Sequence, residues 1–255
     1  MKKVILLLLF TTIVFGQKNA INKIDSVAYY IKLSDFYKQK NNYKLSLSNA
    51  NNALEFASKN KDTKNKALAY TSLGTSYFEL KKINDAIDAF SKSIKELSTL
   101  PISSDLALSY YKLGMCHMSL EEFVRAEAYI NKSQEIYSAL KIENQELIDL
   151  QKGIIYKKKG KVKLATELFN NIISKPDSQD SFKTKAEALY QLGIIESKNN
   201  RYNLALNYLN RALEKNKIDV NTEQRIKILY ALSKANDKLL NLKDSYRYLK
   251  EHVTL

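Results

Sequence analysis

The chain has 255 residues, and the 45% that are apolar can form a continuous core. Only 6 residues are Gly and 2 are Pro, a composition that favours helices and argues against a loop-rich or all-β protein. The formal charge is +14, but the basic residues are interspersed with acidic ones and form no stripe with aromatic residues between them, so we expect no nucleic-acid partner. The single cysteine, Cys116, excludes an intramolecular disulfide bond.

The N-terminal residues 1–16 have the layout of a secretory signal peptide. Lys2 and Lys3 precede the apolar run Val4–Phe15, and Gly16 then offers a small residue for cleavage. The run is short for a membrane span, and no second apolar stretch of sufficient length follows. We therefore expect cleavage after Gly16 and a periplasmic or secreted mature chain without a stable membrane span. The alternative is that the same run stays uncleaved as a membrane anchor.

The remaining chain contains small and large residues that repeat at a spacing of about 40. One small-residue series comprises Ser34, Gly74, Gly114, Gly153, Gly193 and Ser233. A second series follows twelve positions later and comprises Ser46, Ala86, Ala126, Ala165, Ala205 and Ser245. Four positions further on, the residue is usually large, as at Phe90, Ile130, Phe169, Leu209 and Leu249, with Ala50 as the weak member.

These series indicate stacked hairpins of two helices. Two antiparallel helices approach closely only where both carry small side chains, and the large residues then fill the space beside that contact. A single hairpin cannot bury its own apolar face, so the hairpins must stack. The turns inside the hairpins fall between the two small series, for example at Lys81-Lys82 and at Lys159 to Lys161. Pro101 and Pro176 lie between hairpins, where a helix must stop.

The pattern resembles the tetratricopeptide repeat. Leu73-Gly74 with Tyr77, Ala86 and Phe90 reproduces its L-G-x-x-Y…A-x-x-x-F core. The resemblance covers roughly residues 24–255, but Trp is absent and the period is about 40 where the family has about 34. It implies an all-α fold, a right-handed α-solenoid of about six hairpins. We place the repeat domain at 17–255, with units near 27–62, 67–100, 107–140, 146–176, 186–216 and 226–255.

The resemblance also implies a peptide-binding groove, because the first helix of each hairpin lines the concave side in this family. The groove positions carried over by register are Thr71, Thr75, Phe78, Tyr111, Met115, Met118, Leu150, Ile154, Lys157, Tyr190, Ile194, Lys198, Tyr230 and Lys234. The middle of this set is apolar and aromatic and its C-terminal end is basic, which suits a peptide with apolar anchors and an acidic end. The alternative is that these side chains form an inner layer of the core.

No catalytic, cofactor-binding or metal-binding site is expected. His117 occupies the Tyr position of its repeat, where a buried packing role is the simplest interpretation. Cys116 is its neighbour, but adjacent helical residues point in different directions, so the two do not form a nucleophile pair. The same geometry argues against a copper site at Met115 to Met118. Phosphate loops and carboxylates at metal spacing are also absent from the sequence.

The leading hypothesis is therefore an exported, non-enzymatic scaffold that binds a peptide or protein in its concave groove. The alternative is a sensor or regulatory ectodomain-like protein that acts with a signal-transduction partner. The last helix, expected near Lys243–Val253, carries Tyr246, Leu249 and Val253 on a side that no following helix is expected to cover. We expect that side to make an end-to-end contact with a second copy or another partner.

Overall fold

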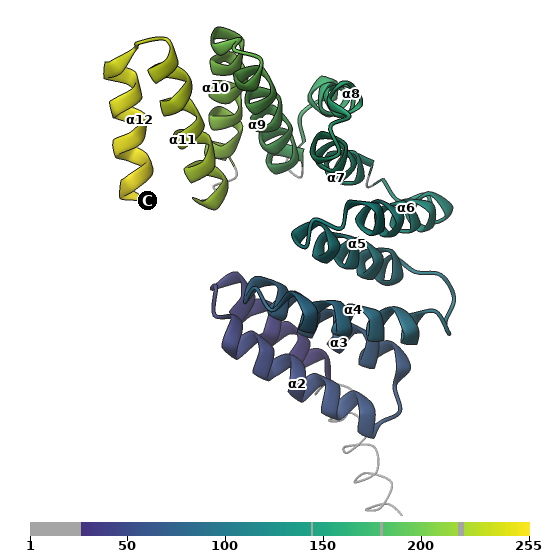
Figure 1. The fold of residues 1–255 in the computed structure, drawn as a ribbon. Coiled ribbons are helices and arrows are strands. Elements are labelled where there is room, and N and C mark those ends of the chain that lie inside the picture. Colours follow the sequence, from purple (N-terminus) through teal and green to yellow (C-terminus); the bar gives the residue numbers. More distant parts are fainter. Residues whose placement is uncertain (1–26, 144, 179–180, 219–221) are drawn as a thin grey trace, which may run out of the picture. The chain divides into compact units, whose positions relative to one another are not determined.

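The computed structural model describes residues 27–143, 145–178, 181–218 and 222–255, and within these ranges every regular element is a helix (Figure 1). The predicted leader at 1–16 lies outside the described residues. The chain divides into two compact units, residues 1–143 and 144–255, which are described separately. The predicted all-α fold of helical hairpins is confirmed.

Unit 1 contains three hairpins. The first pairs a helix over residues 27–39 with α2 (Tyr43–Lys59). The second pairs α3 (Thr63–Glu79) with α4 (Ile83–Leu97), and the third pairs α5 (Ser104–Ser119) with α6 (Phe123–Ala139). Each second helix also contacts the first helix of the next hairpin, as α2 contacts α3 and α4 contacts α5, so the hairpins stack within the unit.

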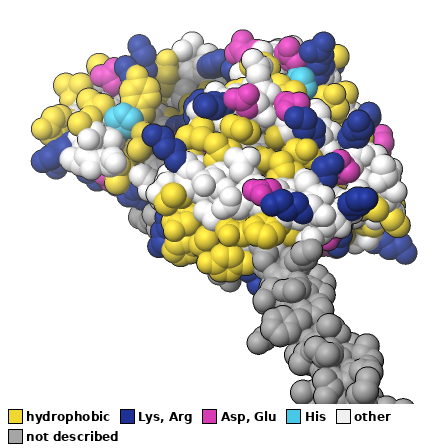
Figure 2. Space-filling model, turned by 90° about the horizontal axis from the view of Figure 1, so that it is seen from below, with side chains coloured by type: hydrophobic (Ala, Val, Ile, Leu, Met, Phe, Trp, Pro, Cys, Tyr) yellow, Lys and Arg dark blue, Asp and Glu magenta, His cyan; other side chains and the backbone are white. Residues whose placement is uncertain are grey.

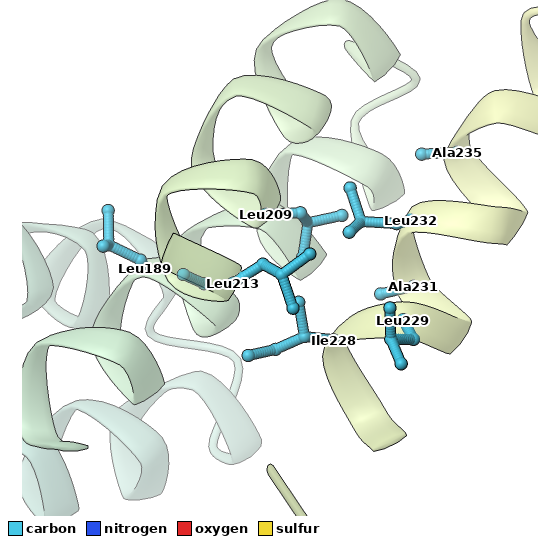
Figure 3. Close-up of a cluster of buried hydrophobic side chains, with 9 residues drawn as sticks. Leu189, Leu209, Leu213, Ile228, Leu229, Ala231, Leu232 and Ala235 are labelled. Carbon is cyan, nitrogen blue, oxygen red and sulfur yellow. The ribbon is translucent and has the colours of Figure 1, made fainter. Parts of the chain in front are cut away.

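Unit 2 repeats this arrangement. Its hairpins are α7 (Gln145–Lys158) with α8 (Val162–Ser174), α9 (Phe182–Lys198) with α10 (Tyr202–Ile218), and α11 (Thr222–Lys238) with α12 (Leu242–Thr254). The buried residues of the core between α10 and α11 are aliphatic: Leu209 and Leu213 face Ile228 and Leu232 (Figure 3). The apolar area buried at such junctions is the main stabilising contribution, because one hairpin alone leaves it exposed to water.

The small residues mark the contacts between the two helices of a hairpin. A Cβ atom added to Gly74 would lie 2.8 Å from the ring of Phe90, and one added to Gly153 would lie 2.5 Å from the ring of Phe169. Gly114 faces Ile130 in the same way. The large residue always lies sixteen positions after the glycine, so the glycines occupy equivalent places, as the repeat predicts. Glycine is required here because the facing side chain occupies the space of its missing Cβ.

In the first and last hairpins, serine replaces both the glycine of the first helix and the alanine of the second. The hydroxyls of Ser34 and Ser46 lie 3.0 Å apart, and those of Ser233 and Ser245 lie 3.2 Å apart. Ser34 and Ser46 are both buried. The close approach therefore persists in these hairpins, with a hydrogen bond between the two small side chains.

The turns within the hairpins share one C-cap geometry. The N–H of Lys82 donates to the Tyr77 carbonyl at 2.9 Å, and that of Lys161 donates to the Tyr156 carbonyl at 2.8 Å. The residue before each donor has a positive φ, 61° at Lys81 and 76° at Gly160. This is the Schellman motif, in which a left-handed residue ends the helix and satisfies its last carbonyls.

A buried lysine secures the connection between α8 and α9. Lys185 is only 2% exposed, and its ammonium donates to the carbonyls of Lys175 and Pro176 at 2.5 and 2.7 Å. It also pairs with Asp177 at 2.9 Å, and hydrogen bonds from Lys215 and from Lys185 hold the pKa of Asp177 below its usual value. The chain around Pro176, where the helix must stop, is thus tied to α9 through charge-assisted hydrogen bonds.

Candidate functional site

A hollow of about 600 Å³ opens on one face of unit 1, and we call it the unit 1 groove. Its walls come mainly from the first helices of three successive hairpins. The lining residues are Ile31, Asp35, Lys38, Tyr43, Leu68, Thr71, Ser72, Thr75, Glu79, Asp105, Leu108 and Lys112. A volume of this size falls within the range of about 300 to 1,000 Å³ that is usual for binding pockets.

Helical periodicity brings these side chains to one face. On α3 the lining positions 71, 72, 75 and 79 follow position 68 by three, four, seven and eleven residues, so they form a stripe along one side of the helix. The stripe carries short polar side chains at its centre, where Thr71, Ser72 and Thr75 lie. Short side chains at these positions leave space between neighbouring first helices, and this space is the hollow.

The two threonines of the stripe bond differently. The Thr71 hydroxyl lies 2.8 Å from the Ser93 hydroxyl and 3.2 Å from that of Ser109, so it links α3 to α4 and α5. Both hydroxyls also donate within their own helix, that of Thr71 to the Ala67 carbonyl at 3.2 Å and that of Thr75 to the Thr71 carbonyl at 2.9 Å. Thr71 therefore supports the packing of the groove wall, whereas Thr75 only lines the groove.

The charges of the groove nearly balance. Asp35, Glu79 and Asp105 bring three carboxylates, and Lys38 and Lys112 bring two ammonium groups, which leaves one excess negative charge. The Asp35 and Lys38 side chains are paired at 2.5 Å. On the face that Figure 2 shows, basic and acidic side chains are likewise interspersed among hydrophobic ones. The groove thus offers apolar contacts from Ile31 and its neighbours with a weakly acidic rim.

The corresponding face of unit 2 is crossed by a network of polar side chains. The Gln191 amide donates to one carboxylate oxygen of Glu187 at 2.6 Å, and the Gln224 amide donates to the other at 3.1 Å. The Lys157 ammonium donates to the Gln191 carbonyl oxygen. Burial, and to a smaller extent the charge of Lys198, lower the pKa of Lys157 to about 8. The network links α7, α9 and α11 through their side chains.

The groove residues predicted in unit 1 have different surroundings. Thr71 and Thr75 line the groove. Tyr111 is only 7% exposed, whereas Met115 and Met118 are half-buried. Phe78 packs against the core between α4 and α5.

Those predicted in unit 2 also differ. Leu150 is buried in a core cluster and Ile154 packs against it, while Tyr190 and Ile194 pack against the cluster of Figure 3. Lys198 is exposed. Tyr230 is 46% exposed, and the Lys234 ammonium lies 5.5 Å from the centroid of its ring. Ligand binding by any of these residues remains a prediction.

Sequence reasoning missed most of the groove wall. Ile31 and Asp35 occupy, in the first hairpin, the register of Thr71 and Thr75 forty residues later. Leu68 lies one turn before Thr71 on α3, and Leu108 occupies the equivalent position on α5. The repeat register itself contains the signal for Ile31 and Asp35, because the first hairpin keeps the same spacing.

Of the residues considered for chemistry, His117 is buried against α6 and Cys116 is buried in the core between α4 and α5. His117 stacks on Tyr129 with ring centroids 5.2 Å apart, and its Nδ1 lies 2.7 Å from the Glu122 carboxylate. Burial raises the pKa of the Cys116 thiol to about 12, so the thiol is protonated and unreactive. In the described ranges, His, Cys, Asp and Glu form no group of three or more suited to a metal ion. Among the described helices, none combines the length and apolar character that a membrane crossing requires.

Comparison with protein families gives three matches to the tetratricopeptide repeat, at residues 67–96, 107–139 and 186–217. These segments correspond to the hairpins α3–α4, α5–α6 and α9–α10. Comparison with curated protein sequences gives no significant match.

Solved structures with the same fold are numerous. The apo form of RapI aligns with a TM-score of 0.71 at 17% identity, over 91% of this chain and 83% of that one. The apo form of the quorum sensor NprR from B. thuringiensis has the same TM-score at 16% identity, over 89% of this chain and 64% of its own. The type IV pilus biogenesis factor PilW aligns at 0.63 and 19% identity, over 88% and 91% of the two chains. These likenesses concern the fold. Together with the three matched hairpins, they show that the chain carries tetratricopeptide repeats.

Proposed function

We propose that this chain is a non-enzymatic interaction scaffold that binds an extended peptide, free or within another protein, in the unit 1 groove. The observation that carries the proposal is the hollow between three successive first helices, lined by apolar and hydroxyl side chains. A peptide buried there gains apolar contacts with Ile31, Leu68 and Leu108, and it finds polar partners along both sides.

The charges of the groove point to the kind of peptide. The excess carboxylate favours a neutral or weakly basic segment over the acidic one that the sequence suggested, because an acidic segment meets repulsion at Glu79 and Asp105. A structure of NprR in complex with its cognate peptide NprX has a TM-score of 0.68 to this chain. This likeness supports the proposal only by analogy of fold.

A peptide library displayed on phage and selected on the wild-type protein tests the proposal. Selected peptides should bind the double variant Leu68→Lys, Leu108→Lys at least about tenfold more weakly, as expected when apolar anchors are lost. Leu108→Phe, which fills the hollow without adding charge, should weaken the same peptides. Val124→Lys, on an exposed position of α6, is the matched control and should leave their affinity unchanged. Equal binding to all variants, with native circular dichroism, would place the site elsewhere.

The alternative function is a regulatory one, in which peptide binding alters contact with a signal-transduction partner. The likeness to NprR, whose structure is described as that of a quorum sensor, favours this alternative. It predicts that a selected peptide changes hydrogen exchange outside residues 27–112 as well as in the groove. A passive scaffold predicts protection confined to the groove helices.

Export is a separate part of the proposal. The basic and apolar segments at residues 1–16 support removal of a leader and release of a chain that begins at Gln17. Intact-mass measurement of the protein recovered from its own cells tests this. A mass that includes residues 1–16 would refute cleavage at this position.

A further inference from the structure

The outer face of α12 is apolar and uncovered. Leu242, Tyr246, Leu249 and Val253 are 65, 68, 41 and 76% exposed. Their spacing of four, three and four residues aligns them in one seam along the helix, the pattern of a helix that packs lengthwise on another. We call these four residues the α12 seam. No residue of α12 is buried.

The same register positions are covered in the internal hairpins. Leu209 and Leu213 lie forty residues before Leu249 and Val253, and they are 0 and 7% exposed. They are covered by Ile228 and Leu232 of α11, the first helix of the next hairpin (Figure 3). In unit 1, Phe90 of α4 occupies this register position and packs against Leu113 of α5. The α12 seam is therefore the second-helix half of such a junction, and no helix among the described residues covers it.

The helix over residues 27–39 offers a first-helix surface of the complementary kind. Tyr29 and Phe36 on its outer side are 59 and 49% exposed. Their register equivalents on α3, α9 and α11 are buried by the preceding second helix, with exposures of 0 to 5%. These equivalents are Ala69, Ser76, Ala188, Ile195, Ile228 and Ala235. We call Tyr29, Leu33 and Phe36 the 27–39 face; Leu33 is the half-buried member between the two exposed rings.

We infer that copies of this chain associate head to tail, with the α12 seam of one copy packed on the 27–39 face of the next. The contact continues, between two molecules, the type of junction that α10 and α11 form within one. It is heterologous, so it uses two different surfaces and leaves one of each free at the ends of a chain of copies. The inference does not depend on the unit 1 groove.

The charges beside the two surfaces predict how association depends on salt concentration. Lys32 lies between Tyr29 and Phe36 on the 27–39 face, while Lys243 and Lys250 flank the α12 seam, and all three lysines are exposed. These like charges repel one another across the contact, whereas the apolar residues attract. Association should therefore strengthen as salt rises from about 0.05 to about 0.5 M, because screening shortens the Debye length from more than 10 Å to a few ångströms.

Two variants, each with one surface blocked, test the arrangement. Leu249→Glu with Val253→Glu blocks the α12 seam, and Tyr29→Glu with Phe36→Glu blocks the 27–39 face. In sedimentation velocity, the wild-type protein with its natural N-terminus should form dimers and larger species as concentration rises. Each variant alone should remain monomeric, whereas an equimolar mixture of the two should form dimers and nothing larger. Each variant keeps one of the two surfaces, so one molecule of each variant can pair, and the resulting dimer has no intact surface left for a third molecule.

Other occupants predict other results. A two-fold contact between two α12 seams would let the Tyr29→Glu, Phe36→Glu variant dimerise as well as wild type, and that result overturns the inference. The inference is also overturned if the wild-type protein stays monomeric at millimolar concentration in high salt. The two surfaces would then bind something other than a second copy, such as a helix of another protein or residues 1–26. Val124→Glu is the matched control and should assemble like wild type. Circular dichroism must show native helix content for every variant.

Discussion

The inner faces of the two units use one helical framework in opposite ways. In unit 1, α3 presents Thr71 and Thr75 to a hollow of about 600 Å³. In unit 2, the equivalent positions carry Leu150 and Ile154 on α7 and Tyr190 and Ile194 on α9, which pack against the core. The comparison shows that the repeat determines where an inner face forms, and that short side chains on α3 leave a hollow where larger ones on α7 and α9 fill the space.

Polar groups reinforce the difference. In unit 1, short hydroxyl groups such as those of Thr71, Ser93 and Ser109 bond within the wall and do not reach across the hollow. In unit 2, the longer amide side chains of Gln191 and Gln224 meet on the Glu187 carboxylate and link neighbouring first helices. We therefore expect unit 1 to bind the ligand and unit 2 to contribute mainly to the stability of the fold.

The largest expected effect comes from the contact that both units share. Phe169→Ala in unit 2 should lower the free energy of unfolding by about 3 to 5 kcal/mol, because Phe169 is fully buried. Gly153→Ala should destabilise the wild type by overpacking, since its Cβ would lie 2.5 Å from that ring. In the Phe169→Ala background the same change should instead stabilise by about 1 kcal/mol, through helix propensity.

Chemical denaturation of the four proteins of this cycle gives the coupling energy. Hydrogen exchange adds the comparison between units: Phe169→Ala should speed exchange in unit 2 more than in unit 1, because repeat arrays lose stability locally. Equal acceleration in both units would show that they unfold as one.

The next effect concerns Lys157 of the unit 2 network. Its pKa of about 8 in the folded chain is below the value of about 10.4 in an unfolded chain, so the unfolded state binds more protons between these values. Wild-type stability should therefore rise as pH increases from about 8 to about 10. Lys157→Met should stabilise the protein at pH 7 by about 1 to 2 kcal/mol, allowing for the partial exposure of Lys157 and its lost bond to Gln191. The gain should vanish above pH 10.

Direct titration of the lysine ε-carbon signals by NMR checks the cause. Lys198→Met should raise the pKa of Lys157, because the Lys198 charge is one cause of the shift, yet leave it below the ordinary value, because burial is the larger cause. A Lys157 pKa near 10.4 in the wild type would contradict the desolvation of this side chain.

A smaller effect separates the two threonines of the groove. Thr71→Val should cost about 1 kcal/mol, because its hydroxyl joins those of Ser93 and Ser109. Thr75→Val should be close to neutral, since its hydroxyl bonds only to the backbone of its own helix. Thermal unfolding of this isosteric pair measures the difference. Equal costs would mean that the hydroxyl cluster does not hold the wall of the groove.

The sequence predicts the hairpins well, because the contacts that define them recur at a regular spacing. Gly74 with Phe90 and Gly153 with Phe169 can be recognised in the sequence, because each large residue lies sixteen positions after its glycine. The inner face is less predictable, because the exposure of a side chain depends on residues from neighbouring helices. Leu150 and Thr71 share one register position, yet the first is buried in the core and the second lines a hollow.

The smallest expected effect concerns the hairpin turns, where one turn of unit 2 differs from the others. Gly160 occupies the left-handed position between α7 and α8, with φ of 76°, whereas Lys81 and Glu121 occupy it in unit 1, with φ of 61° and 58°, and Asn200 and Leu240 occupy it in the other turns of unit 2. A residue with a side chain loses about 1 to 2 kcal/mol of folding stability in this conformation. Glycine avoids that loss, but its greater freedom in the unfolded chain offsets part of the gain. Lys81→Gly and Glu121→Gly should each stabilise by about 0.5 kcal/mol, and Gly160→Ala should destabilise by a similar amount.

Denaturant midpoints of these three variants, together with Lys82→Gly as a control, test the turn geometry. Lys82 follows the left-handed residue and donates its N–H to Tyr77, so glycine there offers no relief of strain and should not stabilise. Stabilisation by Lys82→Gly as large as that by Lys81→Gly would show that the gain comes from removing a positive charge from a basic chain. Gly160→Ala carries no charge change, so its loss of stability isolates the backbone contribution.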